Sequence, residues 1–502
     1  MSHRPLTIVD LLDESASRFP GRVALRDAHT ADSFADLATR ANAIAGLLAA
    51  RGVRQGDRVV VLAPTGLAYA AAYYGAMRSG AIAVPLSPAA RATEVNASLA
   101  HCAARAVLLD PEYPESRAVR DEATSNRCEI IDTDEWASAT ASTSARAPTR
   151  PGPDDPACIL YTSGTTGHPK GVVLSHRGLA TNTRAIIRAL SLGPTDSCLT
   201  GLPFNYSFGS SILHTHVAVG ATLHLAPSIV FPSRVLDALC DRRPTGFYGV
   251  PSTYAMLLSR TDPRTVDTSS LRYVAHAGAA MTPTLQRRVR AAFPTADLIV
   301  MYGQTEASAR LTVLPPMRLD EKVGSVGPAV DGVELSVRRE GGEPVAAGET
   351  GDIWVRGESV MLGYWRDPGA TSAVIRHGWL KTGDVGYLDS EGFLFIVGRR
   401  ADIIKSGAHR IHPLEIERVL LETAPVAEAC VVGQDDELMG QLVIAFVVPK
   451  GGERIDPETL RQHCRRRLSS VKVPAEIRVV DRLPKTASGK IRRAELASEG
   501  RP

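Results

Sequence analysis

The sequence of 502 residues predicts an α/β protein: a large N-terminal domain of parallel-rich sheets with covering helices and a small β subdomain, then a small mobile α+β C-terminal lid. Three patterns support this. Helix and strand signals alternate through the first 130 residues, a stretch rich in glycine and β-branched residues follows Lys322, and the last 100 residues again mix helix and strand. A chain of this length buries more than one core.

The first part of the chain has a β-α-β rhythm. Apolar residues at helical spacing predict a helix over Phe34–Ala50. A buried strand is expected at Arg58–Leu62, a helix at Ala68–Arg78 and a second strand at Ile82–Leu86. Strands that alternate with helices in this way favour parallel sheets covered by helices.

The middle of the chain changes character. Residues 137–156 are rich in Ala, Ser, Thr and Pro without periodicity, which predicts an exposed loop. The β-rich subdomain is expected over Lys322–Tyr364, with a turn at Glu340–Glu343. Phe393–Val397 is expected to be a strand that leads into Gly398.

The remaining residues predict a separate α+β unit, so we expect domains at 1–399 and 400–502. Helices are expected over residues 413–421 and 457–468, and strands over 429–432, 442–448 and 476–480.

Composition excludes several classes of protein. The net charge of +3 implies neither a nucleic-acid nor a membrane partner. Seven scattered cysteines without a CxxC pair predict neither disulfides nor a zinc site, and buried free thiols in a reducing cytoplasm are expected. No signal peptide or uninterrupted apolar run of membrane-spanning length is present, so a cytoplasmic protein is expected, as a monomer or homodimer.

The most informative stretch is Ile159–Gly171. Its glycines let backbone N–H groups approach an anion, its hydroxyls donate to phosphate oxygens, and a lysine adds positive charge. It is not a Walker A motif, because no lysine follows the second glycine at the required spacing. The predicted phosphate-binding residues are Thr162, Ser163, Gly164, Thr165, Thr166, Gly167 and Lys170.

This loop resembles the signature loop of the adenylate-forming superfamily, which includes acyl- and aryl-CoA synthetases, peptide-synthetase adenylation domains and luciferase. Further segments resemble the other motifs of that family, in the family's order, and the resemblance extends from about Leu11 to Arg493. These segments are Tyr302–Glu306, Thr382–Asp384, Gly398–Arg399, Lys405–Gly407, Pro413–Glu417 and Pro484–Lys490.

The resemblance implies an ATP- and Mg²⁺-dependent ligase. A carboxylic acid would be adenylated with release of pyrophosphate, and a thiol would then take the acyl group: coenzyme A or the phosphopantetheine arm of an acyl carrier protein. A second possibility is an enzyme that delivers the activated group to a non-thiol acceptor, or that activates an unusual oxyanion. The C-terminal domain would be a lid that rotates between two half-reactions.

The resemblance also implies roles for single residues. Thr305 would contact the α-phosphate, Glu306 would ligate Mg²⁺, and Lys490 would reach the carboxylate when the lid closes. Lys405 and Arg410 would face the site in the second half-reaction. Tyr302 would stack on adenine, and Asp384 and Arg399 would bind the ribose. Further nucleotide-binding positions are expected at Gly278, Ala279, Ala280, Gly303 and Ile396.

The expected hinge position is unusual. The family's charged or polar hinge residue is replaced by Ala401, and Asp402 follows immediately. Either Asp402 takes the role or the hinge is less constrained.

The acid pocket is expected around a segment that we call the acid segment, Leu202–Ser210. Amino-acid-activating relatives carry an aspartate where Asn205 stands, and a buried ammonium without that counter-charge is costly. Asn205 resembles instead the residue that bonds a ring substituent in activators of 2,3-dihydroxybenzoate and salicylate, so planar aryl or unsaturated acids are expected. The alternative is that Asn205 only bonds the backbone. The predicted pocket residues are Phe204, Asn205, Tyr206, Ser210, Gly278 and Gly303; no role is assigned to His214 or His216.

Overall fold

The computed structural model describes residues 7–138, 150–162, 170–226, 228–407, 409–436, 439–451, 453–485 and 491–498. In these residues, no helix is both apolar and long enough to cross a membrane. All seven cysteines are free, and all except Cys240 are buried.

One large sheet of the N-terminal domain is parallel through its centre. Its order is β14-β13-β12-β11-β9-β10-β1-β2, with antiparallel pairs only at the two ends, β13 with β14 and β1 with β2. The strands are β1 (Val23–Arg26), β2 (Ala31–Ser33), β9 (Ser197–Thr200), β10 (Thr222–Leu225), β11 (Gly246–Gly249), β12 (Tyr273–His276), β13 (Asp297–Tyr302) and β14 (Thr312–Leu314).

This order places the predicted motifs together. The acid segment follows β9, residues 278–280 follow β12, and Gly303–Glu306 follow β13. Because β9, β11, β12 and β13 are parallel neighbours, the three segments leave the same edge of the sheet. Ligands of open α/β sheets bind outside the carboxyl ends of the strands.

A second sheet, in the order β18-β8-β7-β4-β3-β5-β6, is parallel except for the antiparallel pairs β7–β8 and β8–β18. Its strands are β3 (Arg58–Leu62), β4 (Ile82–Pro85), β5 (Ala106–Leu109), β6 (Glu129–Asp132), β7 (Pro156–Thr162), β8 (Lys170–Ser175) and β18 (Gly363–Tyr364).

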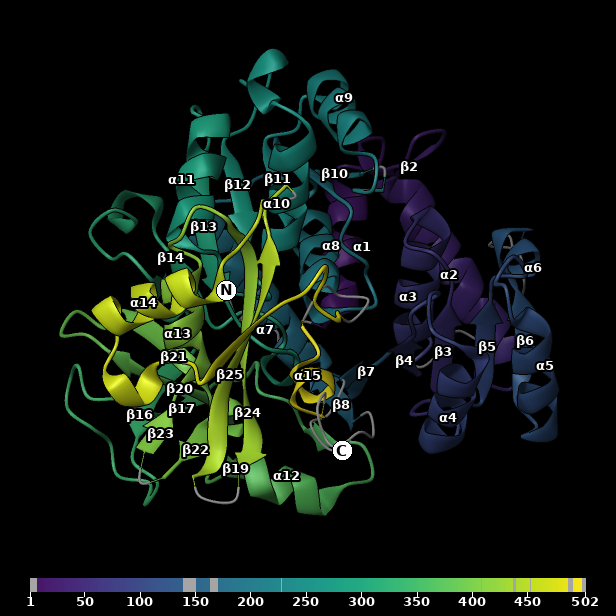
Figure 1. The fold of residues 1–502 in the computed structure, drawn as a ribbon. Coiled ribbons are helices and arrows are strands. Elements are labelled where there is room, and N and C mark those ends of the chain that lie inside the picture. Colours follow the sequence, from purple (N-terminus) through teal and green to yellow (C-terminus); the bar gives the residue numbers. More distant parts are fainter. Residues whose placement is uncertain are drawn as a thin grey trace.

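Helices cover both sheets (Figure 1). Helices α2 and α3 pack closely because Gly75 has no side chain: a Cβ there would lie 2.8 Å from Cβ of Ile44. The helices are α1 (Ile8–Arg18), α2 (Phe34–Ala50), α3 (Leu67–Arg78), α4 (Ala92–Cys102), α5 (Ser116–Ser125), α6 (Thr133–Ser138), α7 (His176–Leu190), α8 (Ser207–Val219), α9 (Pro232–Arg242), α10 (Pro251–Arg260) and α11 (Pro283–Ala292).

The β subdomain is an antiparallel sheet in the order β15-β21-β20-β17-β16, with β19 beside β20. Its elements are β15 (Ser325–Gly327), β16 (Glu334–Arg338), β17 (Gly351–Arg356), β19 (Ile375–Arg376), β20 (Trp379–Leu388), β21 (Leu394–Arg399) and the helix α12 (Pro368–Val374). The predicted range of this subdomain, Lys322–Tyr364, was wrong at its C-terminal end. Tyr364 lies in β18, which pairs with β8 of the second sheet.

The C-terminal elements form a small α+β group in front of the N-terminal domain in Figure 1. They have two apolar cores of their own, one on each side of the β24–β25 hairpin. The elements are β22 (Ile404–Ser406), β23 (His409–Ile411), α13 (Pro413–Leu420), β24 (Val426–Asp436), β25 (Gly440–Pro449), α14 (Pro457–Arg467), β26 (Glu476–Val479) and α15 (Arg493–Ser498).

The structure confirms the predicted α/β fold with a large N-terminal and a small C-terminal domain. The helix over Phe34–Ala50 and the strand over Arg58–Leu62 have the predicted bounds. The loop expected over 137–156 is shorter at both ends, because α6 includes Ser138 and β7 begins at Pro156.

Candidate active site

The predicted phosphate loop joins two antiparallel strands. Thr162 ends β7 and pairs with Lys170, the first residue of β8. Ser163, Gly164, Thr165, Thr166 and Gly167, with the rest of 163–169, lie outside the described residues. Nζ of Lys170 lies 5.0 Å from the ring centroid of Tyr364.

Tyr364 connects this lysine to the predicted metal ligand. Its hydroxyl donates to Oε1 of Glu306 at 3.1 Å. Burial first, and the Glu306 carboxylate second, raise the pKa of Tyr364, so its hydroxyl stays a proton donor at neutral pH. Lys170, Tyr364 and Glu306 are therefore successive neighbours, although they come from distant parts of the chain.

The donor set around Glu306 is compatible with Mg²⁺ delivered together with a nucleotide. The described residues contain no group of three His, Cys, Asp or Glu side chains arranged to hold a metal. Mg²⁺ keeps several waters and is often bound by one or two carboxylates plus substrate phosphates, rather than by a cage of protein ligands. A single half-buried carboxylate that accepts from Tyr364, the neighbour of Lys170, fits that pattern.

Thr305 lies at the junction between the nucleotide motif and the acid segment. It begins the short 3₁₀ helix η2 (Thr305–Ala307). Its hydroxyl lies 3.1 Å from the hydroxyl of Ser207, the first residue of α8. The two predicted half-sites therefore meet at this pair.

Tyr302, Asp384 and Arg399 form one hydrogen-bonded group. The hydroxyl of Tyr302 donates to Oδ2 of Asp384 at 2.6 Å, and Nε of Arg399 donates to Oδ1 at 3.1 Å. Asp384 and Arg399 are direct partners on β20 and β21. Burial and the carboxylate raise the pKa of Tyr302, and Asp384 raises that of Arg399.

Small residues leave backbone accessible near this group. Gly278, with φ of +86°, Ala279 and Ala280 are exposed after β12. Gly303 has no room for a side chain, because a Cβ there would lie 1.7 Å from the carbonyl oxygen of Ala309. Any larger residue at position 303 would displace the chain that follows η2.

The predicted C-terminal site residues are placed only in part. Lys405 is exposed on β22, and Arg410 is its register partner on β23. The carbonyl of Ile396 accepts from Nη2 of Arg418 on α13 at 3.2 Å, a direct link between the domains. Lys490 lies outside the described residues.

The acid segment carries a buried amide. Asn205 is 8% exposed, and its side chain makes no hydrogen bond within the described residues, although its amide atoms are not fully shielded from solvent. Phe204 is fully buried, 5.9 Å from the ring of Tyr69 between centroids. Tyr206 is half-buried at the N-cap of α8, and the buried hydroxyl of Ser210 donates to the carbonyl of Ser207.

Sequence reasoning missed Arg310, which lies eight residues after Tyr302. It is 2% exposed, and Asn182 holds its backbone through bonds to both N–H and C=O. Its guanidinium lies 4.8 Å from the ring centroid of Phe208 in the acid segment. Tyr364 was also missed, and Ser207 was given no role of its own within the acid segment, because only folding places them beside motif residues.

The two unassigned histidines of α8 are buried. Nδ1 of His214 lies 2.9 Å from the hydroxyl of Tyr74, and that of His216 bonds the carbonyl of Ile212. Burial lowers the pKa of His214 to about 3 and that of His216 to about 4. Both are neutral at pH 7, and their contacts are those of core residues.

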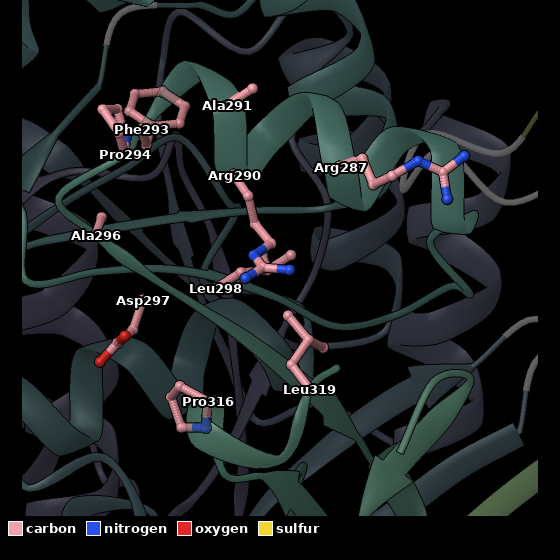
Figure 2. A pocket seen from close by; sticks show the side chains of 10 residues that line it. All are labelled: Arg287, Arg290, Ala291, Phe293, Pro294, Ala296, Asp297, Leu298, Pro316 and Leu319. Carbon is pink, nitrogen blue, oxygen red and sulfur yellow. The ribbon is translucent and has the colours of Figure 1, made fainter. Parts of the chain in front are cut away.

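A surface hollow lies elsewhere, beside α11 (Figure 2). Its apolar lining includes Phe293, Leu298 and Leu319, and Arg290 at its side pairs with Asp320. It shares no residue with the predicted site. The chemistry of the motifs, rather than this hollow, locates the candidate active site.

Comparisons with known proteins agree with the fold and motifs. Residues 12–365 match the family "AMP-binding enzyme", and residues 415–490 match the "AMP-binding enzyme C-terminal domain". A feruloyl-CoA synthase from Amycolatopsis is 34% identical, over 95% of this chain and 96% of its own. A long-chain-fatty-acid–CoA ligase from Bacillus subtilis is 32% identical, over 98% and 94%.

Solved structures show the same similarity. The o-succinylbenzoate CoA synthetase of Bacillus subtilis, in complex with its acyl-adenylate intermediate, superposes with a TM-score of 0.87 at 31% identity, over 98% of both chains. Adenylate-forming CoA ligases use ATP, Mg²⁺ and coenzyme A. The chain belongs to the AMP-binding enzyme family, the adenylate-forming superfamily, and is an AMP-forming acid–thiol ligase.

Proposed function

We propose that this enzyme activates a planar aryl or unsaturated carboxylic acid, preferably one with a hydroxyl or amino substituent. The observation that carries this is the Asn205 side chain: the residue is 8% exposed and makes no side-chain hydrogen bond within the described residues, so its amide is available to a substrate. A buried amide gains from a hydrogen bond that a substrate supplies, and a neutral amide does not replace a carboxylate as partner of an ammonium. Tyr206 and Phe208 add flat half-buried surfaces to the same segment.

Membership of the family does not identify the acid substrate. The two relatives above act, by their names, on an aromatic and on a long-chain aliphatic acid. The preference for an aryl acid therefore depends on the acid segment of this chain.

The nucleotide roles follow from the contacts. Asp384 and Arg399 would hold the ribose, and Tyr302 would orient that carboxylate while its ring faces the adenine. The predicted loop residues, with Lys170, would bind the β- and γ-phosphates, and Thr305 the α-phosphate. Glu306 would hold the Mg²⁺, which when bound neutralises phosphate charge.

Lys490 would neutralise the negative charge that develops between carboxylate and α-phosphorus. This role requires the C-terminal domain to close on the N-terminal domain, and the proposed boundary lies between residues 399 and 400. Lys405 and Arg410 would face the site when the domain turns for acyl transfer.

The chain around this boundary is anchored on both sides. Arg399 pairs with Asp384, and Arg400 pairs with the buried Asp352, both in the N-terminal domain. Asp402 pairs with Arg493 in the C-terminal domain. Ala401 lies between these anchors with an exposed methyl group, which supports rotation about this residue.

The proposed acceptor is a thiol, coenzyme A or the phosphopantetheine arm of an acyl carrier protein. The relatives are named as CoA ligases, so delivery to a non-thiol acceptor is the alternative that the experiment below is designed to exclude. A cytoplasmic enzyme, monomeric or homodimeric, is proposed for either acceptor.

Pyrophosphate release over a panel of acids tests the proposal. Hydroxy- and aminobenzoates and cinnamates are expected to exceed amino acids and long saturated fatty acids, and addition of coenzyme A should yield the thioester. Preference for a zwitterionic amino acid would contradict the aryl assignment. Adenylate that accumulates unchanged with both coenzyme A and a loaded carrier protein would favour the non-thiol acceptor.

A further inference from the structure

Arg310 is a buried cation without a counter-charge in the described part of the chain. Arg310 is 2% exposed, and no Asp or Glu of the described residues pairs with its guanidinium. Nη2 donates to Oγ of Ser211 at 3.3 Å, but the buried Nε–H has no acceptor. Burial lowers the pKa of Arg310 only to about 10, so the group is charged at neutral pH.

Such a group is costly for the folded protein. Buried arginine is normally paired with a carboxylate, and a buried N–H donor without an acceptor loses free energy. The backbone bonds from Asn182 hold Arg310 in place, so its burial is built into the fold. The cost is consistent with a partner that is not part of the protein.

The position of Arg310 identifies where that partner would lie. The guanidinium stacks on Phe208 and bonds Ser211, two residues of the first two turns of α8. Phe208 also belongs to the acid segment, next to Ser207 at the Thr305 junction. Arg310 therefore lies beside the proposed acid pocket, and the first turn of α8 contains no acidic residue that could pair with it.

The start of α8 adds a second source of positive potential. The helix is 13 residues long, has no side-chain cap and has no acidic residue in its first turn. The first N–H groups of a helix have no intrahelical partner and carry partial positive charge. Stacking on Phe208 occupies a face of the guanidinium, while its N–H groups point outward in the plane of the group.

We propose that Arg310 recognises a second anionic group on the acid substrate, a carboxylate or sulfonate remote from the carboxylate that is adenylated. This proposal deepens the proposed function and rests on it, because the second anionic group would bind in the same acid pocket. Arg310 is then the residue that selects dianionic acids over their neutral analogues.

Matched substrates test this directly. The probes are the three benzenedicarboxylates and their monomethyl esters, since each ester keeps one carboxylate and removes the second charge. Wild-type kcat/KM for pyrophosphate release is expected to favour at least one dicarboxylate over its ester. Arg310→Met should lower kcat/KM for that dicarboxylate roughly 10- to 100-fold, the range of a hydrogen bond to a charged group. The kcat/KM for its ester should change little.

A control arginine separates charge recognition from stacking and folding. Arg272 also lies over an aromatic ring, Tyr273 at 5.0 Å, but it pairs with Asp196. Arg272→Met should keep the wild-type preference. The Tm of the Arg310→Met variant should equal or exceed that of the wild type, because an uncompensated buried charge is removed.

Two results would overturn the inference: equal use of every dicarboxylate and its ester by the wild type, or equal losses for both in Arg310→Met. If the wild type releases pyrophosphate with no acid at all, the proposed function fails separately. Thermal shift with the dicarboxylates then decides: a rise in Tm for wild type but not for Arg310→Met supports the anion site, and equal Tm shifts overturn it.

Discussion

The nucleotide half and the acid half of the candidate site differ in how their polar groups are satisfied. Asp384 is bonded by Tyr302 and Arg399, and Glu306 by Tyr364, so protein contacts hold both described carboxylates of the nucleotide half. In the acid half, and within the described residues, the buried Nε of Arg310 has no acceptor, and Asn205, which is 8% exposed, makes no side-chain hydrogen bond. A preorganised nucleotide site suits the common substrate, whereas unpaired groups make selectivity depend on what the acid supplies.

Lys490→Ala is expected to have the largest effect, because this lysine would act where the two halves meet. Adenylate formation should lose about 3–5 kcal/mol of transition-state stabilisation. Transfer from a preformed adenylate should be far less affected in single-turnover assays. Lys485→Ala is the control, since Lys485 pairs with Glu428 within the C-terminal domain. Equal losses in both half-reactions would refute the two-position lid.

Glu306→Gln tests the nucleotide half. The amide keeps the shape and removes the charge, so ATP use should weaken by roughly 2–4 kcal/mol at low magnesium and recover in part at high magnesium. A magnesium titration of pyrophosphate release measures this. Glu358→Gln is the control, because Glu358 is exposed and bonds Thr181. Unchanged magnesium dependence in Glu306→Gln would remove this residue from the metal site.

Asn205→Leu tests the acid half. It should cost about 1–3 kcal/mol with a hydroxyl- or amino-substituted ring, since the substituent would lose its partner. The unsubstituted ring should lose much less, and KM for ATP should stay near the wild-type value. The same loss with both acids would show that Asn205 does not bond the ring substituent.

Tyr302→Phe sharpens the comparison with the smallest change. Removing the hydroxyl leaves Asp384 with one fewer donor. The resulting fall in kcat/KM for ATP should correspond to a loss of about 0.5–1.5 kcal/mol of transition-state stabilisation. The relative preference among acids should not change, because the lost contact belongs to the nucleotide half. A variant that alters acid preference instead would show that the two halves are not separate.

Local structure was largely predictable from sequence. The helix over Phe34–Ala50 begins where Ser33 and Asp36 form a capping box, which is a short-range signal. Tyr364 was assigned to the wrong sheet, because the pairing of β18 with β8 joins residues about 190 positions apart. Strand partners at such separation leave no periodic trace in the sequence.

The candidate site divides in the same way. The motif types at Thr162–Lys170, Tyr302–Glu306 and Asp384 determined the family and the chemistry, since phosphate, metal and ribose each require particular side chains. The burial of Arg310 was decided only by tertiary structure, because an arginine in a polar stretch is usually solvated. Packing among α7, α8 and β14 removes it from water, and packing depends on contacts that no local pattern records.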